Sequence, residues 1–294
     1  LWFVLICKER VMQSVETPSV KASIKSIINN KPILLMTLSQ ILGSFAVGGS
    51  KQDYYIDVLN FASLGLITGI PGAIINPFSY MAVPWFRRHF SSRFLYIIGN
   101  KIDGILLVPV FLVGCIGGKK HGLYKNIWVM GIAMMLWETI FMIFYGVRRI
   151  IPTEMYNEAM DYCEWKNGYR TEGMTSVAQG LASKLASIFS RYISNYIKQL
   201  IGYDLTRYVR GTAQTDETKF GLFAMFTIVP FLTGMISIIP MLFYDLSGKK
   251  KEKMYEELLE RRAAMSKEAT SGDLEALERL AKAQMEIGNM KQEL

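Results

Sequence analysis

The chain has 294 residues, of which 51% are apolar and 20% are charged, with a formal net charge of +8 and a mean hydropathy of +0.21. Residues 249–294 contain ten basic and ten acidic side chains, so the whole net charge lies in the rest of the chain. These values exclude a disordered chain and a small disulfide scaffold, and they argue against an ordinary soluble enzyme. They predict an all-α polytopic membrane protein with a soluble tail.

The first seven residues are apolar but too short to cross a bilayer, and we expect them to be the last turns of a helix whose beginning is absent. The sequence is therefore expected to be a fragment. Residues 1–31 would form the end of that helix and a polar connector, 32–245 six membrane helices, and 246–294 a helical cytoplasmic tail. A bilayer core of ~30 Å needs about 20 helical residues. The six segments that meet this length are 32–55, 64–86, 94–116, 127–151, 175–201 and 220–244.

Basic residues gather in alternate connections: before the first predicted span, between the second and third, between the fourth and fifth, and after the sixth. The opposite connections, one of which contains Lys51, carry fewer. By the positive-inside rule the richer connections face the cytoplasm. Both ends of the chain are then expected to be cytoplasmic. Within the tail, 254–265 and 273–285 are each predicted to form a short amphipathic helix.

The fifth predicted span is unusually polar. Four of its side chains recur at helical spacing and share one face: Lys184, Ser187, Arg191 and Asn195. Such a face suits a helix that lines a water-filled cavity. Lys184 falls near mid-depth, where a charge is costly and indicates a functional site. It either takes part in transport or forms a structural ion pair with a buried carboxylate such as Asp103 or Glu138.

Other intramembrane charges leave two interpretations open. Asp103 and Glu138 are either proton or cation sites or partners of buried basic groups. Arg148 and Arg149 either anchor the fourth span at the cytoplasmic interface or turn into a cavity. In a cavity, the guanidinium fork suits recognition of a carboxylate or a phosphate.

The most specific motif is 161–172, which reads Asp-Tyr-Cys-Glu-Trp-Lys-Asn-Gly-Tyr-Arg-Thr-Glu. It resembles the cytoplasmic loop before helix 11 of the glycoside–pentoside–hexuronide:cation symporters, a melibiose permease-like family of the major facilitator superfamily. Residues 8–11 with 30–32 resemble the family's connector between helices 6 and 7, and 243–246 with 257–262 resemble its exit from helix 12. The resemblance implies that the chain is the C-terminal half, helices 7–12, of a transporter that alternates access between two six-helix halves.

The resemblance also implies roles for particular residues. Lys184 corresponds to a helix 11 lysine near the sugar and cation sites, and Gln179 to a glutamine close to the sugar. The charged residues of the motif are implied to help hold an inner gate: Asp161, Glu164, Arg170 and Glu172. Glu158 stands where the family usually has Asp. Arg149 stands where melibiose permease has tryptophan, which places a galactoside substrate in doubt and would suit an anionic sugar such as a uronide.

The sequence and its resemblance together predict cation-coupled symport, with sodium or protons, of a sugar, glycoside or uronide across the bacterial cytoplasmic membrane. The expected partners are the sugar, the lipid bilayer and an N-terminal six-helix half. The family's coupling carboxylates lie mainly on helices 2 and 4, so no metal site is assigned here and no other cofactor is expected. The alternative is a non-transporting membrane scaffold or sensor, or a half-transporter remnant.

An enzyme is not predicted, because the three cysteines and two histidines are too scattered for a metal site or a nucleophile–base pair. The sequence contains neither a dinucleotide-binding glycine motif nor a phosphate-binding loop. Nucleic-acid binding is also not predicted, because the basic residues are spread through connections as topology signals.

Overall fold

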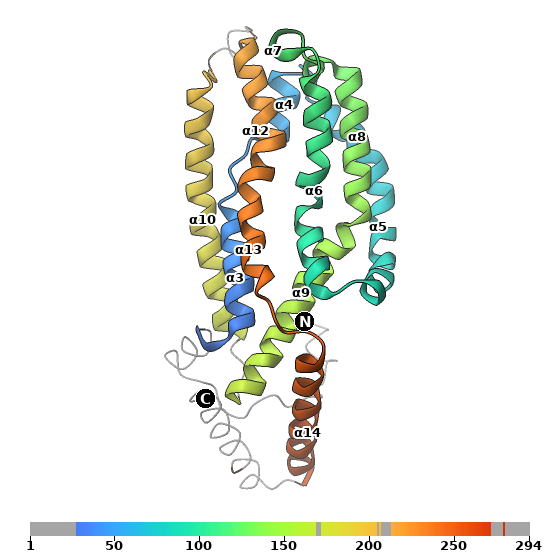
Figure 1. Ribbon diagram of the computed structural model, residues 1–294, viewed down its shortest axis with the longest axis vertical. Coiled ribbons are helices and arrows are strands. Elements are labelled where there is room, and N and C mark those ends of the chain that lie inside the picture. The colour runs from blue at the N-terminus through green and yellow to red at the C-terminus, as the bar shows by residue number, and fades with distance from the viewer. Residues whose placement is uncertain (1–27, 169–171, 205, 207–212, 272–278, 280–294) are drawn as a thin grey trace, which may run out of the picture. The chain divides into compact units, whose positions relative to one another are not determined.

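The computed structural model describes residues 28–168, 172–204, 206, 213–271 and 279. Within these residues the secondary structure is helical throughout, with no strand (Figure 1). The elements are α3 (Lys31–Ser44), α4 (Lys51–Asp57), α5 (Leu64–His89), α6 (Ser92–Cys115), α7 (Gly118–His121), η1 (Leu123–Lys125), α8 (Ile127–Ile143), α9 (Tyr145–Asn167), α10 (Glu172–Leu200), α12 (Asp216–Gly234), η2 (Met235–Ile238), α13 (Ile239–Leu242) and α14 (Lys249–Ser271).

Four helical segments of the described chain are long and apolar enough to cross a membrane: Leu64–His89, Ser92–Cys115, Ile127–Asn167 and Asp216–Leu242. The chain is therefore an all-α polytopic membrane protein. These four correspond to the second, third, fourth and sixth predicted spans. The fourth continues well beyond its predicted end because α9 follows α8 after one turn residue, Phe144.

The first and fifth predicted spans differ from these four. The prediction of one continuous helix over 32–55 was wrong, because α3 ends at Ser44 and α4 begins at Lys51. Ser50 caps the second helix by accepting a hydrogen bond from the N–H of Gln52. The fifth span is a continuous helix, α10, of 29 residues, but its polar face keeps its hydropathy low.

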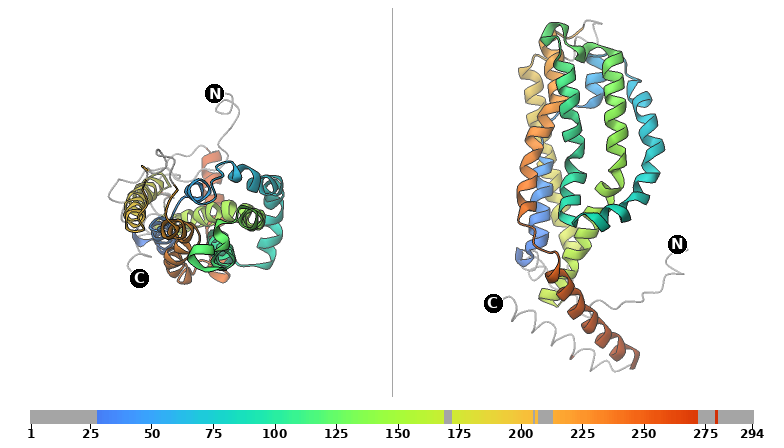
Figure 2. Two further views of the ribbon diagram at one scale, coloured as in Figure 1. Left: turned by 90° about the horizontal axis from the view of Figure 1, so that it is seen from above. Right: turned by 45° about the vertical axis from the view of Figure 1, so that its right-hand side comes forward.

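The chain divides into two compact parts. The terminal part comprises Leu1–Thr37, Glu154–Gly180 and Phe243–Leu294, and the bundle part comprises Leu38–Thr153 and Leu181–Leu242. In the bundle part, α8 packs between α5 and α6, and α6 also packs along α12 (Figures 1 and 2).

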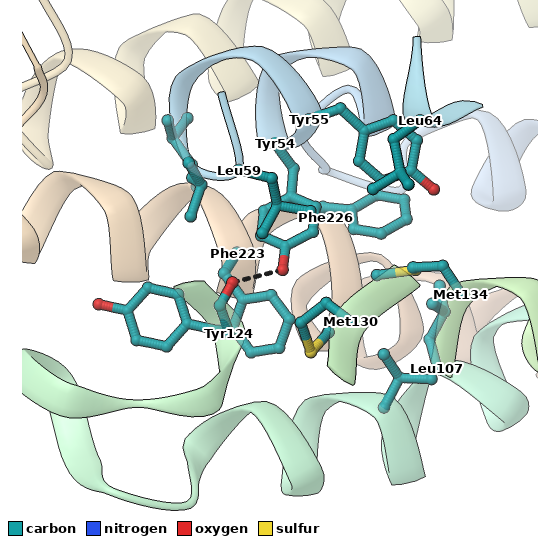
Figure 3. Close-up of a cluster of buried hydrophobic side chains, with 13 residues drawn as sticks. Tyr54, Tyr55, Leu59, Leu64, Leu107, Tyr124, Met130, Met134, Phe223 and Phe226 are labelled. Atoms are coloured by element: carbon teal, nitrogen blue, oxygen red, sulfur yellow. Dashed lines mark hydrogen bonds between the residues drawn. The ribbon is translucent and has the colours of Figure 1, made fainter. Parts of the chain in front are cut away.

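An aromatic cluster forms the core of the bundle part. The hydroxyl of Tyr54 on α4 donates to the carbonyl of Tyr124 at 2.6 Å, and Figure 3 shows this bond beside the rings of Phe223 and Phe226. The rings of Tyr124 and Phe223 stack with centroids 5.4 Å apart. A Cβ at Gly114 would lie 2.3 Å from the Phe223 ring, so this close approach requires glycine. The cluster therefore joins α4, α6 and α12 through packed rings and a satisfied tyrosine hydroxyl.

The terminal part corrects the interpretation of the motif as a loop. Asp161–Asn167 are the last turns of α9, and the helix ends where Gly168, at φ +81°, donates its N–H to the carbonyl of Glu164 at 2.8 Å. In the tail, the predicted helix 254–265 lies within the longer α14. The predicted helix 273–285 lies outside the described residues.

Candidate functional site

An unwound segment, 45–50, interrupts the first predicted membrane helix. Backbone groups at membrane depth must find hydrogen-bond partners within the protein. Groups from α10 and α12 satisfy this segment: Ser190 Oγ donates to Ala46 O (2.7 Å), Ser194 Oγ accepts from Gly48 N (3.2 Å), Thr233 Oγ1 accepts from Val47 N (3.0 Å) and Met225 O accepts from Gly49 N (2.8 Å). Discontinuous helices of this kind form substrate and ion sites in membrane transporters.

An ion pair lies at the start of α4, where the chain becomes helical again after the unwound segment. Lys51 Nζ, at the first position of α4, lies 2.7 Å from Glu138 Oε2 on α8, and the Glu138 side chain is only 14% exposed. The hydroxyl of Thr68 donates to the same oxygen at 3.4 Å. The ammonium group also lies 5.7 Å from the ring centroid of Tyr55 and 5.6 Å from that of Trp137. A carboxylate, an ammonium group and two aromatic rings thus share one half-buried place in the bundle.

The sequence-based prediction missed this place because it put Lys51 in an outer connection. The adjacent Gly48 and Gly49 followed by Ser50 carry a local signal for a break and a new helix start. The sequence marks Glu138 either as a proton or cation site or as the partner of a buried basic group, and in the structure it pairs with Lys51.

Arg148 and Lys198 of the bundle part also form ion pairs with carboxylates. Arg148 Nη1 is 3.1 Å from Asp103 Oδ2, and its guanidinium also lies 5.3 Å from the ring centroid of Phe141. Lys198 Nζ is 2.5 Å from Asp53 Oδ2. Asp103 and Glu138 are thus both partners of basic groups in this structure, and neither is the partner of Lys184.

Lys184 lies on the exposed side of α10. The same helix buries Ala186, Ser190 and Ser194 against the bundle part. Arg191 is exposed on the same side as Lys184. Among the described residues, no carboxylate lies within ion-pair distance of Lys184. Lys184 and Arg191 therefore lie on a side of α10 that the described helices leave exposed.

Gln179 and Arg149 have local partners in the structure. In the terminal part, the Gln179 side-chain amide donates to Thr37 Oγ1 at 2.5 Å, which ties α10 to α3. In the bundle part, Arg149 is exposed, and its Nε donates to the hydroxyl of Tyr145 at 3.1 Å. The guanidinium lies 5.4 Å from the centroid of the same ring, so Tyr145 contacts and orients the exposed Arg149 side chain.

The motif residues of the terminal part bind the tail helix. Arg262 on α14 contacts Glu164 through Nε (3.1 Å) and Nη2 (2.6 Å), and its Nη2 also lies 2.8 Å from Asp161 Oδ1. The hydrogen bonds to Glu164 have the largest effect on the pKa of the Arg262 guanidinium. Together with those to Asp161 they raise it, although burial acts in the opposite direction. Lys251 of α14 pairs with the buried carboxylate of Glu158. Both helices are labelled in Figure 1.

A tryptophan completes this contact between α9 and α14. Trp165 Nε1 donates to Glu257 Oε2 at 2.7 Å, while Arg261 Nη1 donates to the Trp165 carbonyl at 3.1 Å. Arg170 and the side chain of Glu172 lie outside the described residues. Asp161, Glu164 and Glu158 are thus brought together with the tail, a partner that the motif alone did not reveal.

The comparisons with known proteins agree with this architecture. Residues 2–248 match the family of MFS/sugar transport proteins. The chain belongs to this family. Within the described residues, no group of three or more histidine, cysteine or carboxylate side chains could hold a metal ion.

Curated relatives cover most of this chain. A glucuronide carrier protein homolog of Escherichia coli (strain K12) is 23% identical over 258 residues, covering 85% of this chain and 52% of the relative. The inner membrane symporter YicJ of the same organism is 23% identical, covering 91% of this chain and 55% of the relative. The isoprimeverose transporter of Lactiplantibacillus pentosus is 24% identical, covering 87% and 50%. The chain therefore spans about half the length of the curated relatives it matches.

Proposed function

We propose that this chain supplies helices 7–12 of a cation-coupled symporter that moves a sugar, glycoside or uronide across the cytoplasmic membrane. Family membership supports transport of a sugar, and a relative named as an inner membrane symporter supports both the coupling and the location. In this proposal an N-terminal six-helix half completes the transporter. The ends of the chain lie in the cytoplasm, as the distribution of basic residues predicts.

The unwound segment 45–50 is the observation that carries the proposal. A break in a membrane helix costs backbone hydrogen bonds, and here side chains of two other helices replace them. The break brings the Lys51–Glu138 pair into the interior of the bundle. Sugar hydroxyl groups both donate and accept, so a paired ammonium and carboxylate beside Trp137 suit them through charge-assisted hydrogen bonds and ring stacking.

Lys184 on α10 is a second proposed substrate-binding residue, in addition to the Lys51–Glu138 pair. Its ammonium group is exposed on α10 and has no ion-pair partner among the described residues, so no bond within them has to break before it meets a ligand. In the proposed transporter it faces the central cavity and binds substrate, as the resemblance implies, with Gln179 on the same helix. Sodium or a proton couples the movement through carboxylates that the N-terminal half provides.

Arg149 is proposed to make the transporter prefer an anionic sugar. It is exposed and stacked on Tyr145, and one relative is named as a glucuronide carrier homolog. A guanidinium fork matches the two oxygens of a uronide carboxylate. In the complete transporter, the variant Arg149→Gln is expected to lose uronide uptake more than uptake of a neutral glycoside, and equal losses for both sugars would contradict this assignment.

The motif contacts provide the proposed inner gate. Asp161, Glu164 and Glu158 fasten α14 to the end of α9, and Arg170 and Glu172 are proposed to act in the same gate. Alternating access requires contacts between the two halves to form and break as the halves rock, and the joined ends of α9 and α14 are proposed to present this chain's side of that gate.

Uptake with and without a sodium or proton gradient tests the proposal. The chain is produced together with the N-terminal six-helix half that the proposal requires, and labelled glycosides and uronides are supplied. Gradient-dependent uptake that Lys184→Ala abolishes, and that Lys267→Ala on the tail leaves intact, is the expected result. Absence of uptake for the intact pair of halves would favour the scaffold or remnant interpretation instead.

A further inference from the structure

The junction of α9 and α14 in the terminal part contains a small pocket lined by charged and aromatic side chains. Its volume is about 390 Å³, and its lining residues are Tyr162, Trp165, Lys166, Lys250, Lys253 and Glu257. Three ammonium groups and one carboxylate thus surround a space with two aromatic walls. The proposed transport function makes no use of this pocket.

The carboxylate that lines the pocket is already engaged. Glu257 Oε2 accepts a hydrogen bond from Trp165 Nε1 at 2.7 Å and lies 3.6 Å from Arg261 Nη2. Lys253 lies 3.9 Å from the other oxygen, and its side chain is 72% exposed. Glu257 therefore neutralises at most one of the basic groups around it, and Lys253 keeps most of its contact with water.

The other two lysines are held in place without being fully neutralised. Lys166 Nζ donates to the backbone carbonyl of Asn29 at 3.3 Å, which carries no net charge. Lys250 lies 5.3 Å from the ring centroid of Tyr162 and 3.1 Å from Asp245, and Asp245 is shared with Lys31 at 3.2 Å. One carboxylate between two ammonium groups leaves a positive excess. The lining of the pocket thus keeps a positive excess.

In the sequence, the α14 residues that line the pocket closely follow the end of the last membrane segment, Asp216–Leu242. Phe243, 63% exposed, ends the apolar run, and four lysines follow within ten residues: Lys249, Lys250, Lys251 and Lys253. The Asn30 side chain, next to the start of α3, donates to the carbonyl of Ala159 at 2.8 Å, one turn before the pocket residues of α9. Tryptophan and tyrosine favour the boundary between hydrocarbon and water. A basic cluster that directly follows a membrane segment on the cytoplasmic side suits the head group of an anionic lipid.

We propose that the α9–α14 pocket binds the phosphate of an anionic phospholipid such as phosphatidylglycerol. The three ammonium groups donate to the phosphate oxygens, and Trp165 and Tyr162 pack against the glycerol. A bound lipid would bridge α9 and α14 alongside the ion pairs of Arg262. Because this binding requires only the terminal part of the chain, it is independent of whether the protein transports a sugar.

Native mass spectrometry of the purified chain in detergent tests the proposal with phosphatidylglycerol as the added probe. The triple variant Lys166→Ala, Lys250→Ala, Lys253→Ala is expected to bind phosphatidylglycerol at least tenfold more weakly than the unaltered chain. The matched control, Lys119→Ala, Lys120→Ala, Lys267→Ala, removes the same charge from exposed sites elsewhere and is expected to change affinity less than twofold. Equal weakening by the two triple variants would show a diffuse electrostatic effect and overturn the pocket.

Two further experiments are needed. The first distinguishes the phosphate of a lipid from a soluble phosphate, and the second shows that lost binding is not caused by misfolding. Phosphatidylcholine is expected to bind weakly and equally to all forms, and soluble glycerol phosphate is expected not to displace phosphatidylglycerol. Displacement at equal concentration would overturn a lipid ligand in favour of a soluble phosphate. The single variants Lys166→Gln and Lys253→Gln, which keep the Lys250–Asp245 pair, are each expected to weaken binding about threefold while helical circular dichroism is unchanged. Unchanged affinity in both would also overturn the proposal.

Discussion

Lys51 Nζ and Glu138 Oε2 lie 2.7 Å apart inside the bundle, although 87 residues separate the two side chains in the sequence. The pair joins the helix that resumes after the unwound segment to the middle of α8. Removing one member of such a pair leaves a half-buried charge without its partner, whereas removing both leaves none.

We therefore predict that Lys51→Ala destabilises the chain more than the double variant Lys51→Ala, Glu138→Ala. The single substitution should cost about 2 kcal/mol, below the range for fully buried pairs because the lysine side chain is 30% exposed. Thermal unfolding in detergent, combined in a double-mutant cycle, measures the coupling. Additive effects of the two substitutions would show that the pair contributes no coupling energy.

The unwound segment gives a second prediction. Ser190→Ala should cost about 1–3 kcal/mol, because the carbonyl of Ala46 loses its partner in a place with little water. Ser187→Ala is the matched control on the same helix, since among the described residues its hydroxyl bonds to the Ser183 carbonyl of its own helix. Chemical unfolding of both variants in detergent provides the comparison. A smaller loss for Ser190→Ala than for Ser187→Ala would contradict this assignment of the hydrogen bonds.

Lys184 should separate function from stability. Because its side chain is exposed and makes no ion pair with the described residues, Lys184→Ala is expected to leave the melting temperature of this chain within about 1 °C, as for a neutral surface change. In the transporter proposed above, it is expected to reduce uptake at least tenfold. A large drop in melting temperature would instead identify Lys184 as a structural residue.

Arg262 should control the attachment of the tail. Arg262→Ala leaves Glu164 and Asp161 close together without their shared cation, so α14 is expected to exchange its amide hydrogens faster and to be cut more readily by protease. Arg262→Lys restores charge but not the fork and should recover only part of the protection. The control Lys267→Ala lies on the same helix and should change neither readout.

Asp245 gives a prediction on pH. Burial favours its neutral form, but hydrogen bonds from Lys250 and Lys31 outweigh this and lower the pKa of the Asp245 carboxyl. Its contribution to tail attachment is therefore complete above the pKa of an unfolded aspartate, about 4, and is lost as pH falls through the lower folded value. Asp245→Asn should speed hydrogen exchange in α14 at pH 7, and this difference from the unaltered chain should shrink under strongly acidic conditions.

Local periodicity determined much of this protein from sequence alone. Long apolar runs predict helices because an isolated helix satisfies its own backbone in lipid, and the charged spacing of Lys184, Arg191 and Asn195 predicts one polar face because helical geometry is local. The motif around Asp161 and Glu164 predicted the family for the same reason, since it is read from consecutive residues. The family is confirmed by the match over residues 2–248.

Only the tertiary structure decided the break at 45–50, the Lys51–Glu138 pair and the tail helix as the partner of the motif. Each depends on contacts between residues far apart in the chain: 144 positions for Ser190 and Ala46, and 98 for Arg262 and Glu164. A helix unwinds when distant side chains satisfy its backbone, and a charge enters a membrane bundle when an opposite charge meets it there. Neither condition is encoded in the hydropathy of the segment itself, so Lys51 was assigned to a loop and Asp161 was left without its partner until the helices were packed.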